Sequence, residues 1–241
     1  MLLGGPPAYA AGKDSGQKIG WSQLIAASGM AAVAFDIRSD HYLATPIDPS
    51  QDIAAAVGFV HTYGEKFGID GTRLCTLGFS IGTAPWHLWA TMREPSPDVR
   101  CNVVYYGPLD FKTLHLSLDP NLVDEFSALT WLRRHDSKVP AMLIAKAGRN
   151  ENEGINDSLD RFVAAAQELR ADVRLVTHPT GSHGFDLRNA EATSRSIIRQ
   201  TLAYFRSRLR RVRTALSVAR CRGDRGSSRP RVAPAPARPK R

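Results

Sequence analysis

Short apolar runs alternate with helical patterns along most of this chain of 241 residues. The runs are too short for typical helices and are typical of strands buried on both faces of a sheet. They lie at residues 31–37, 73–79, 101–106, 141–147 and 173–178. Helix candidates separate them at 52–67, 83–92 and 156–169. Strands separated by helices form βαβ units, so the pattern predicts an α/β domain with a mostly parallel sheet and helices on both faces.

Residues 107–139 form a segment longer than a simple crossover, and it is rich in Leu, Phe and Trp. In open α/β sheets the ligand lies outside the carboxyl ends of the strands. We therefore predict a helix and a loop that form a pocket wall there. Ordinary packing of a helix on the sheet is an equal alternative for most of these residues.

The charge of the chain is divided unevenly. The net charge is +9, but residues 206–241 contain 13 Lys and Arg against one acid, Asp224, and the remaining residues sum to −3. We predict a folded domain over residues 1–209 and a basic Arg/Pro/Ala-rich tail over 210–241, which is the end of the last helix and then disordered. Contact of this tail with nucleic acid or an anionic membrane surface is one hypothesis. A solvated tail, or sequence from an altered reading frame, is the alternative that we favour.

The cysteines and the apolar runs indicate where in the cell the protein is located. Cys75 and Cys101 lie in strand-like runs and are predicted to be buried free thiols, because three cysteines make no disulfide framework in a chain of this length. No run approaches the roughly 20 apolar residues of a membrane-spanning helix. The first ten residues lack the basic start of a signal peptide. We expect a cytoplasmic protein.

Gly78-Phe79-Ser80-Ile81-Gly82 matches the pattern G-x-S-x-G. The match directly follows a strand candidate and precedes a helix candidate, which is the context of a nucleophile elbow. The tight turn requires small residues on both sides of the serine, because larger ones would clash with the strand and the helix. Ser80 is therefore the candidate nucleophile.

A serine hydroxyl needs a base to take its proton, and histidine has a suitable pKa. In the chain order nucleophile, acid, histidine, the base lies late in the sequence. His183 lies in a small-residue loop after the last strand candidate and is our candidate, with His178 as the alternative. The five other histidines, His87 among them, are predicted to be surface or packing residues.

The acid that orients the histidine is expected in the loop after residues 141–147. Glu151 is our choice, and Asn150, Glu153 and Asp157 are its rivals.

Acyl transfer also needs hydrogen-bond donors for the developing oxyanion. We expect the backbone N–H of Ile81 to supply one donor and the glycine-rich start at Gly4 and Gly5 to supply the other. A flexible start with no role in the site is the alternative for the two glycines.

Taken together, these residues resemble the α/β-hydrolase superfamily, in particular its dienelactone-hydrolase-like and small serine esterase branches. The resemblance covers roughly residues 3–208. It is carried by Gly4-Gly5-Pro6, Gly78 to Gly82, Ala147-Gly148-Arg149 with Gly154-Ile155-Asn156, and His183-Gly184-Phe185. It implies hydrolysis of a small-molecule carboxylic ester or lactone through an acyl-enzyme, without a metal or organic cofactor.

The sequence departs from this pattern in two places. Relatives usually have aspartate at the position of Asn150, and an asparagine offers no negative charge and can favour the wrong histidine tautomer. Relatives also have further strands before the Gly-Gly segment, whereas only Met1-Leu2-Leu3 precedes it here, so we expect the first strands to be missing. A non-catalytic member of the fold is therefore the second hypothesis.

Overall fold

Six parallel strands form the single sheet in the part of the chain that the structure describes. The structure is a computed structural model that describes residues 1–7, 12–38, 46–116 and 118–210. The strands are β1 (Leu2–Gly5), β2 (Val33–Asp36), β3 (Leu74–Phe79), β4 (Val99–Tyr105), β5 (Ala141–Ala147) and β6 (Val173–His178). Their order is β2-β1-β3-β4-β5-β6, and all neighbouring pairs are parallel. The predicted α/β class with a parallel sheet is confirmed.

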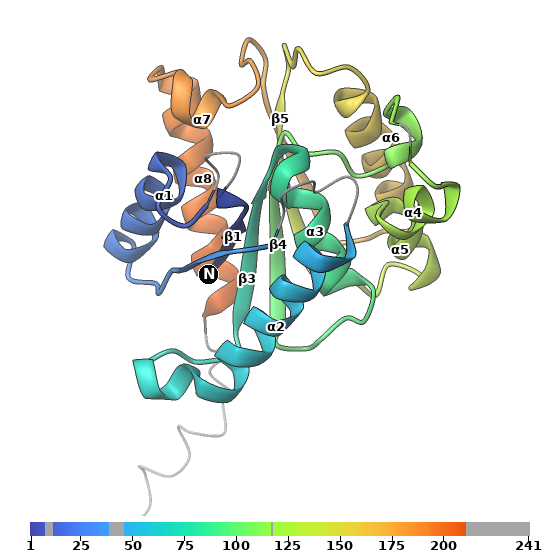
Figure 1. The fold of residues 1–241 in the computed structure, drawn as a ribbon. Coiled ribbons are helices and arrows are strands. Elements are labelled where there is room, and N and C mark those ends of the chain that lie inside the picture. The colour runs from blue at the N-terminus through green and yellow to red at the C-terminus, as the bar shows by residue number, and fades with distance from the viewer. Residues whose placement is uncertain (8–11, 39–45, 117, 211–241) are drawn as a thin grey trace, which may run out of the picture. The chain divides into compact units, whose positions relative to one another are not determined.

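Helices cover both faces of this sheet (Figure 1). The helices are α1 (Gly16–Ala27), α2 (Ile47–Tyr63), α3 (Ser80–Met92), α4 (Pro120–Glu125), α5 (Ala128–Arg134), α6 (Ile155–Glu168), α7 (Phe185–Arg188) and α8 (Ala192–Leu209), with 3₁₀ turns η2 (Gly64–Phe67) and η3 (Phe111–Thr113). Helices α1 and α8 lie on one face, and α3, α5 and α6 lie on the other. Helix α1 was not predicted from the sequence; its Ser15 cap accepts a hydrogen bond from the backbone N–H of Lys18.

Two apolar cores lie on the two faces of the sheet. Val103 contributes to the core under α1 and α8, and its neighbour Val104 contributes to the core under α3, α5 and α6. Successive strand side chains point to opposite faces, so a strand covered on both faces needs apolar residues without alternation. This is the physical reason that the buried strands appear as continuous apolar runs in the sequence.

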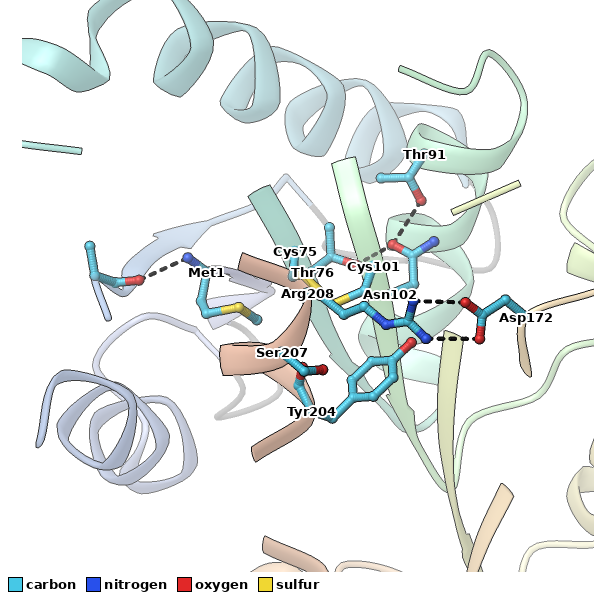
Figure 2. The surroundings of a disulfide bond; sticks show 11 residues. Met1, Cys75, Thr76, Thr91, Cys101, Asn102, Asp172, Tyr204, Ser207 and Arg208 are labelled. Atoms are coloured by element: carbon cyan, nitrogen blue, oxygen red, sulfur yellow. Dashed lines mark hydrogen bonds and ion pairs between the residues drawn. A yellow bond between two sulfur atoms is a disulfide. The ribbon is translucent and has the colours of Figure 1, made fainter. Parts of the chain in front are cut away.

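Cys75 and Cys101 form a disulfide, so the prediction of free thiols is wrong (Figure 2). The parallel register of β3 and β4 places the two residues opposite each other, with their Cα atoms 4.6 Å apart. Both side chains are fully buried. Beside the disulfide, Thr76 and Thr91 both donate hydrogen bonds to Asn102 Oδ1 (2.6 and 3.1 Å). The sequence does not show the register of two strands that are 26 residues apart, which is why the bond was missed.

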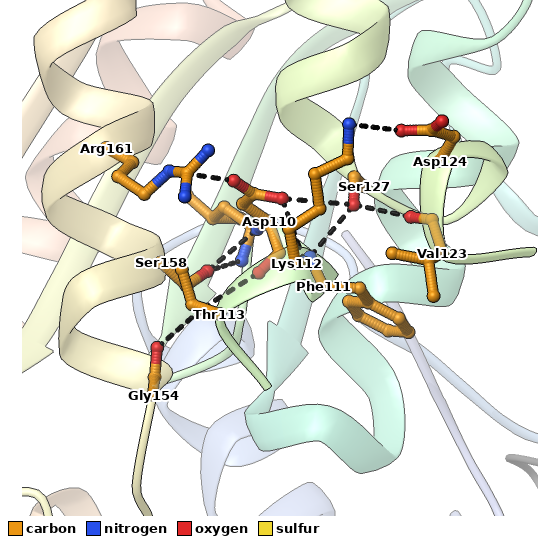
Figure 3. A network of polar contacts seen from close by, with 11 residues as sticks. Asp110, Phe111, Lys112, Thr113, Val123, Asp124, Ser127, Gly154, Ser158 and Arg161 are labelled. Carbon is orange, nitrogen blue, oxygen red and sulfur yellow. Dashed lines mark hydrogen bonds and ion pairs between the residues drawn. The ribbon is translucent and has the colours of Figure 1, made fainter. Parts of the chain in front are cut away.

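The segment after β4 is fixed by a buried polar network (Figure 3). Asp110 is 1% exposed and forms an ion pair with Arg161 on α6 (3.0 Å). Ser158 Oγ accepts hydrogen bonds from the backbone N–H groups of Leu109 and Asp110 (2.6 and 2.7 Å). Thr113 donates to the carbonyl of Gly154 (2.8 Å), which ties this segment to the loop before α6.

The compact unit of the structure extends from Met1 to Leu209, the last residue of α8. Among the described residues, no helix is both long enough and apolar enough to cross a membrane. Residues 211–241 lie outside the described part, so the hypotheses on tail contact with nucleic acid or a membrane surface stay hypotheses.

Candidate functional site

Ser80 lies at the junction between β3 and α3, at the carboxyl edge of the sheet. Its φ of 52° lies in the left-handed region, which costs a non-glycine residue about 1–2 kcal/mol. Thr83 holds the turn by accepting a hydrogen bond from the backbone N–H of Phe79 and donating one to the Phe79 carbonyl (2.9 Å). Strain of this kind, held by its surroundings, is typical of functional sites.

The turn leaves room for no side chain at two glycines. A Cβ at Gly78 would lie 2.7 Å from the Cα of Ala84, and one at Gly107 would lie 2.5 Å from the Cβ of Ala84. An added Cβ at Gly82, in contrast, would have no atom within 4 Å apart from its chain neighbours and the backbone of its own helix. The expectation that both glycines of the motif are needed for space is therefore right for Gly78 and wrong for Gly82. Gly107, which follows β4, is the residue that sequence reasoning missed.

The structure brings Ser80, His183 and Asn150 together. The Ser80 hydroxyl donates to His183 Nε2 across 2.8 Å. His183 Nδ1 lies 3.1 Å from Asn150 Oδ1. Arg149 and Gly181 join the two loops that carry His183 and Asn150 through a backbone hydrogen bond (2.9 Å).

A neighbouring backbone group fixes the orientation of the Asn150 amide. The N–H of Asn152 donates to Asn150 Oδ1 (3.1 Å), so this oxygen, and not the Nδ2 group, faces His183. An oxygen at that place accepts a hydrogen bond from Nδ1–H, so the ring proton stays on Nδ1 and Nε2 is unprotonated. His183 therefore has the tautomer that can accept the Ser80 proton.

The other predicted acids occupy different places. Glu151 accepts the backbone N–H of His183 through Oε2 (2.9 Å) and does not hydrogen-bond to the imidazole. This hydrogen bond is the main reason that the pKa of Glu151 is lowered. In the described part of the chain, neither Glu153 nor Asp157 hydrogen-bonds to His183. The alternative base His178 is fully buried and contacts Ser194 and Glu191.

The pKa of His183 is lowered chiefly because the ring is partly buried. The carboxylates of Glu151 and Asp186 oppose this effect, and the guanidinium of Arg188 adds to it. A lowered pKa keeps the imidazole neutral at neutral pH, as a general base requires.

Gly4 is held by two buried side chains. Its N–H donates to His87 Nε2 (3.3 Å), and its carbonyl accepts from Lys18 Nζ (2.9 Å). Burial lowers the pKa of His87 to about 3, so His87 is neutral and can accept this bond. The Gly4 N–H is thus already used, and the Gly5 carbonyl pairs with the N–H of Ile37 (3.1 Å). The expected oxyanion donor at Gly4 is not available in this structure.

A pocket of about 380 Å³ opens beside Ser80. Its apolar part is made by Ile81, Leu114, Leu116 and Ile155. Leu114 and Leu116 belong to the segment 107–139, so part of this segment forms the predicted pocket wall. Glu151, Asn152, Glu153 and His115 make the polar part.

No protein-family model and no curated protein matches this sequence. Solved structures do match. One is carboxyl esterase 2 of the mycorrhizal fungus Tuber melanosporum, with a TM-score of 0.71 and 21% identity over 87% of this chain and 78% of that chain. Another is a truncated carbohydrate esterase from gut microbiota, with a TM-score of 0.69 and 15% identity over 86% of this chain and 84% of that chain.

A third similar structure is an acetyl ester-xyloside bifunctional hydrolase of Caldicellulosiruptor lactoaceticus. Its TM-score is 0.69, with 18% identity over 86% of this chain and 81% of that chain. At this level of identity the similarity establishes the fold alone. The chain has the α/β-hydrolase fold.

Proposed function

We propose that this chain is a serine hydrolase that cleaves carboxylic ester or lactone bonds through an acyl-enzyme. The observation that carries the proposal is the 2.8 Å hydrogen bond from Ser80 to His183 Nε2, with Nδ1 of the same ring on Asn150. A nucleophile, a base and an orienting group in this order form the arrangement that activates a serine. The fold neighbours named as esterases support ester bonds as the target.

The proposed reaction has two stages. Ser80 Oγ attacks the acyl carbon while its proton passes to His183 Nε2, and Nε2 then returns this proton to the oxygen of the departing alcohol. Next, Nε2 takes a proton from water, whose oxygen attacks the acyl carbon, and the proton returns to Ser80 Oγ as the carboxylic acid leaves. The proposed oxyanion donor is the N–H of Ile81, in the first turn of α3, where N–H groups lack partners within the helix.

The pocket favours a small acyl group. Four aliphatic side chains adjoin Ser80 in a pocket of about 380 Å³, which suits a short aliphatic chain. One fold neighbour, an esterase of Thermogutta terrifontis with a TM-score of 0.61, is a butyrate-bound structure, which agrees with this size. We therefore propose esters of short carboxylic acids as substrates.

The test combines covalent labelling with turnover. A fluorophosphonate probe should label Ser80, and the chain should hydrolyse nitrophenyl acetate and butyrate. Ser80→Ala should abolish labelling and reduce hydrolysis by about 10⁴-fold or more. Ser96→Ala is the matched control, because Ser96 lies before β4, at the opposite edge of the sheet. Labelling and hydrolysis that survive Ser80→Ala would exclude the assignment.

A non-catalytic protein of this fold is the second candidate. Two observations favour it: the orienting residue Asn150 is neutral, and the Gly4 N–H is bonded to His87. On this hypothesis the unmodified chain shows neither labelling nor turnover. It still melts cooperatively, which shows that the missing activity does not come from misfolding.

A further inference from the structure

Asp186 is a carboxylate close to His183 that the proposed reaction does not use. It lies on α7, three residues after His183. Trp21 Nε1 and Gln17 Nε2, both on α1, donate to its Oδ2 (2.9 and 3.0 Å), and the Tyr106 hydroxyl donates to its Oδ1. Among the described residues, no Lys or Arg forms an ion pair with it. The structure thus holds a negative charge beside the histidine with neutral donors only.

Tyr106 connects this carboxylate to the imidazole. Its ring packs against the His183 ring, with centroids 4.6 Å apart and an interplanar angle of 55°. Tyr106 is 2% exposed and has a φ of 39°, again in the left-handed region. Its backbone N–H donates to the Ala145 carbonyl (2.8 Å), and its hydroxyl is held by Asp186 and Gln17. A strained residue held at both ends forms a fixed surface for the ring that it touches.

The charges around His183 come from three elements. Glu151, in the loop after β5, lies on its backbone N–H, and Asp186 and Arg188 lie on α7. Lys18 of α1 is fully buried, interacts electrostatically with Asp186, and has a pKa lowered to about 7, chiefly by burial. The side chain bonded to Nδ1, Asn150, carries no charge. An imidazolium formed at His183 is therefore stabilised by carboxylates that do not touch its ring nitrogens.

We propose that Asp186 is a positioning residue for His183. Through the Tyr106 ring it holds the imidazole between Ser80 and Asn150, and together with Glu151 it stabilises the imidazolium by its charge, which neutral Asn150 does not. Asp186 exchanges no proton in this role. The proposal rests on the proposed function, and it identifies a charge that the asparagine position lacks.

Asp186→Asn is the first test, because it removes the charge and keeps the size. We expect kcat/KM for nitrophenyl acetate to fall by about 10-fold or more and the acid limb of the pH profile to move to lower pH. Histidine NMR should show the same downward move of the His183 pKa without any substrate. The control Asp160→Asn removes an exposed carboxylate on α6 that pairs with Lys146, and should change neither quantity.

A double-variant cycle separates charge from structure. In the Asn150→Asp background, Asp186→Asn should cost several-fold less activity than in the unmodified chain, because the new aspartate supplies the missing charge. Equal losses in both backgrounds would show a merely structural role and overturn the proposal.

Tyr106→Phe provides a second variant in case Asp186→Asn does not fold. It keeps the ring on His183 but removes the link to Asp186, and we expect a smaller loss of kcat/KM in the same direction. If the parent chain is active and Asp186→Asn changes neither the His183 pKa nor kcat/KM, the role of Asp186 is refuted and the proposed function stays intact. A parent chain that neither labels nor hydrolyses would instead refute the proposed function, while the NMR titration would still report on the charge.

Discussion

Asn150 is the residue where the sequence departs from the usual triad, and its surroundings explain how an asparagine fits there. The N–H of Asn152 holds the amide oxygen toward His183, so the substitution does not impose the wrong tautomer. What is lost is the negative charge. The Nδ2 group of Asn150 is buried and has no hydrogen-bond partner among the described residues.

Asn150→Asp should therefore increase activity. The aspartate adds a charge at Nδ1 of His183, and we expect kcat/KM to rise by about 10-fold or more, measured with nitrophenyl acetate. The second carboxylate oxygen would lie where Nδ2 lacks a partner, so a loss of about 1 kcal/mol in the free energy of unfolding should accompany the gain. Asn121→Asp is the control, because Asn121 is exposed on α4 and does not line the pocket beside Ser80. A fall in activity of Asn150→Asp would contradict this view of the site.

The pH profile should report the lowered pKa of His183. The base acts when it is neutral, and burial moves its pKa below the ordinary value of 6.5. On the acid side, kcat/KM should therefore fall with a midpoint below 6.5, and most activity should remain at that pH. Glu151→Gln removes a charge that raises the pKa, so it should move the midpoint further down. A midpoint above 6.5 in the unmodified chain would be inconsistent with this burial.

At the scale of elements, α1 connects the parts of the site. Its Gln17 and Trp21 bind Asp186, and its Lys18 binds the Gly4 carbonyl and lies over the Phe79 ring, 4.8 Å from its centre. This helix was not predicted from the sequence. His87 was predicted to be a surface or packing residue, and it is buried, but its bond to Gly4 was not expected. These roles depend on contacts between residues far apart in the chain, which no local pattern reports.

Lys18→Met tests the buried ammonium through stability. Burial lowers the pKa of Lys18 from 10.5 to about 7, so between these values the unfolded chain binds more protons than the folded one. The unmodified chain should then lose stability as pH falls from 10 to 7, by more than about 1 kcal/mol relative to Lys18→Met. Urea unfolding at both pH values measures this. Lys138→Met, at an exposed lysine, should keep the pH dependence of the parent; equal slopes for the parent and Lys18→Met would exclude the shift.

The disulfide between β3 and β4 should stabilise β3, the strand that ends directly before Ser80. It closes a segment of 26 residues, for which chain entropy predicts about 3.5 kcal/mol. The Cys75→Ala/Cys101→Ala variant should therefore melt roughly 5–15 °C lower, measured by circular dichroism.

Without reductant, alkylation of the unfolded chain should modify one cysteine, Cys221, and with reductant all three. Three modified cysteines without reductant would contradict the bond. Disulfides are rare in reducing compartments. The bond therefore does not support the predicted cytoplasmic location, which stays a prediction.

At the scale of the whole molecule, the sequence predicted the parallel α/β fold and the approach of His183 to Ser80. Buried strands, the elbow motif and the chain order each leave a local trace in the sequence. The residue that orients His183 was harder to predict from the sequence. Asn150 and Glu151 are adjacent, and only the turn that Asn152 closes decides which of the two side chains faces the ring. The disulfide and the Asp186 contacts depend on register and long-range packing, which leave no such trace.

The compact unit has its own core, sheet and candidate site, all within residues 1–209. A chain shortened after Arg210 should therefore keep its melting temperature within a few degrees and its kcat/KM within about 2-fold. It should also lose the whole net positive charge of +9, since residues 211–241 contain 10 Lys and Arg against one acid, Asp224. Retention of the full and the shortened chain on a nucleic-acid column at rising salt tests whether the tail binds anions. A marked fall in melting temperature on shortening would show that residues beyond Arg210 contribute to the fold.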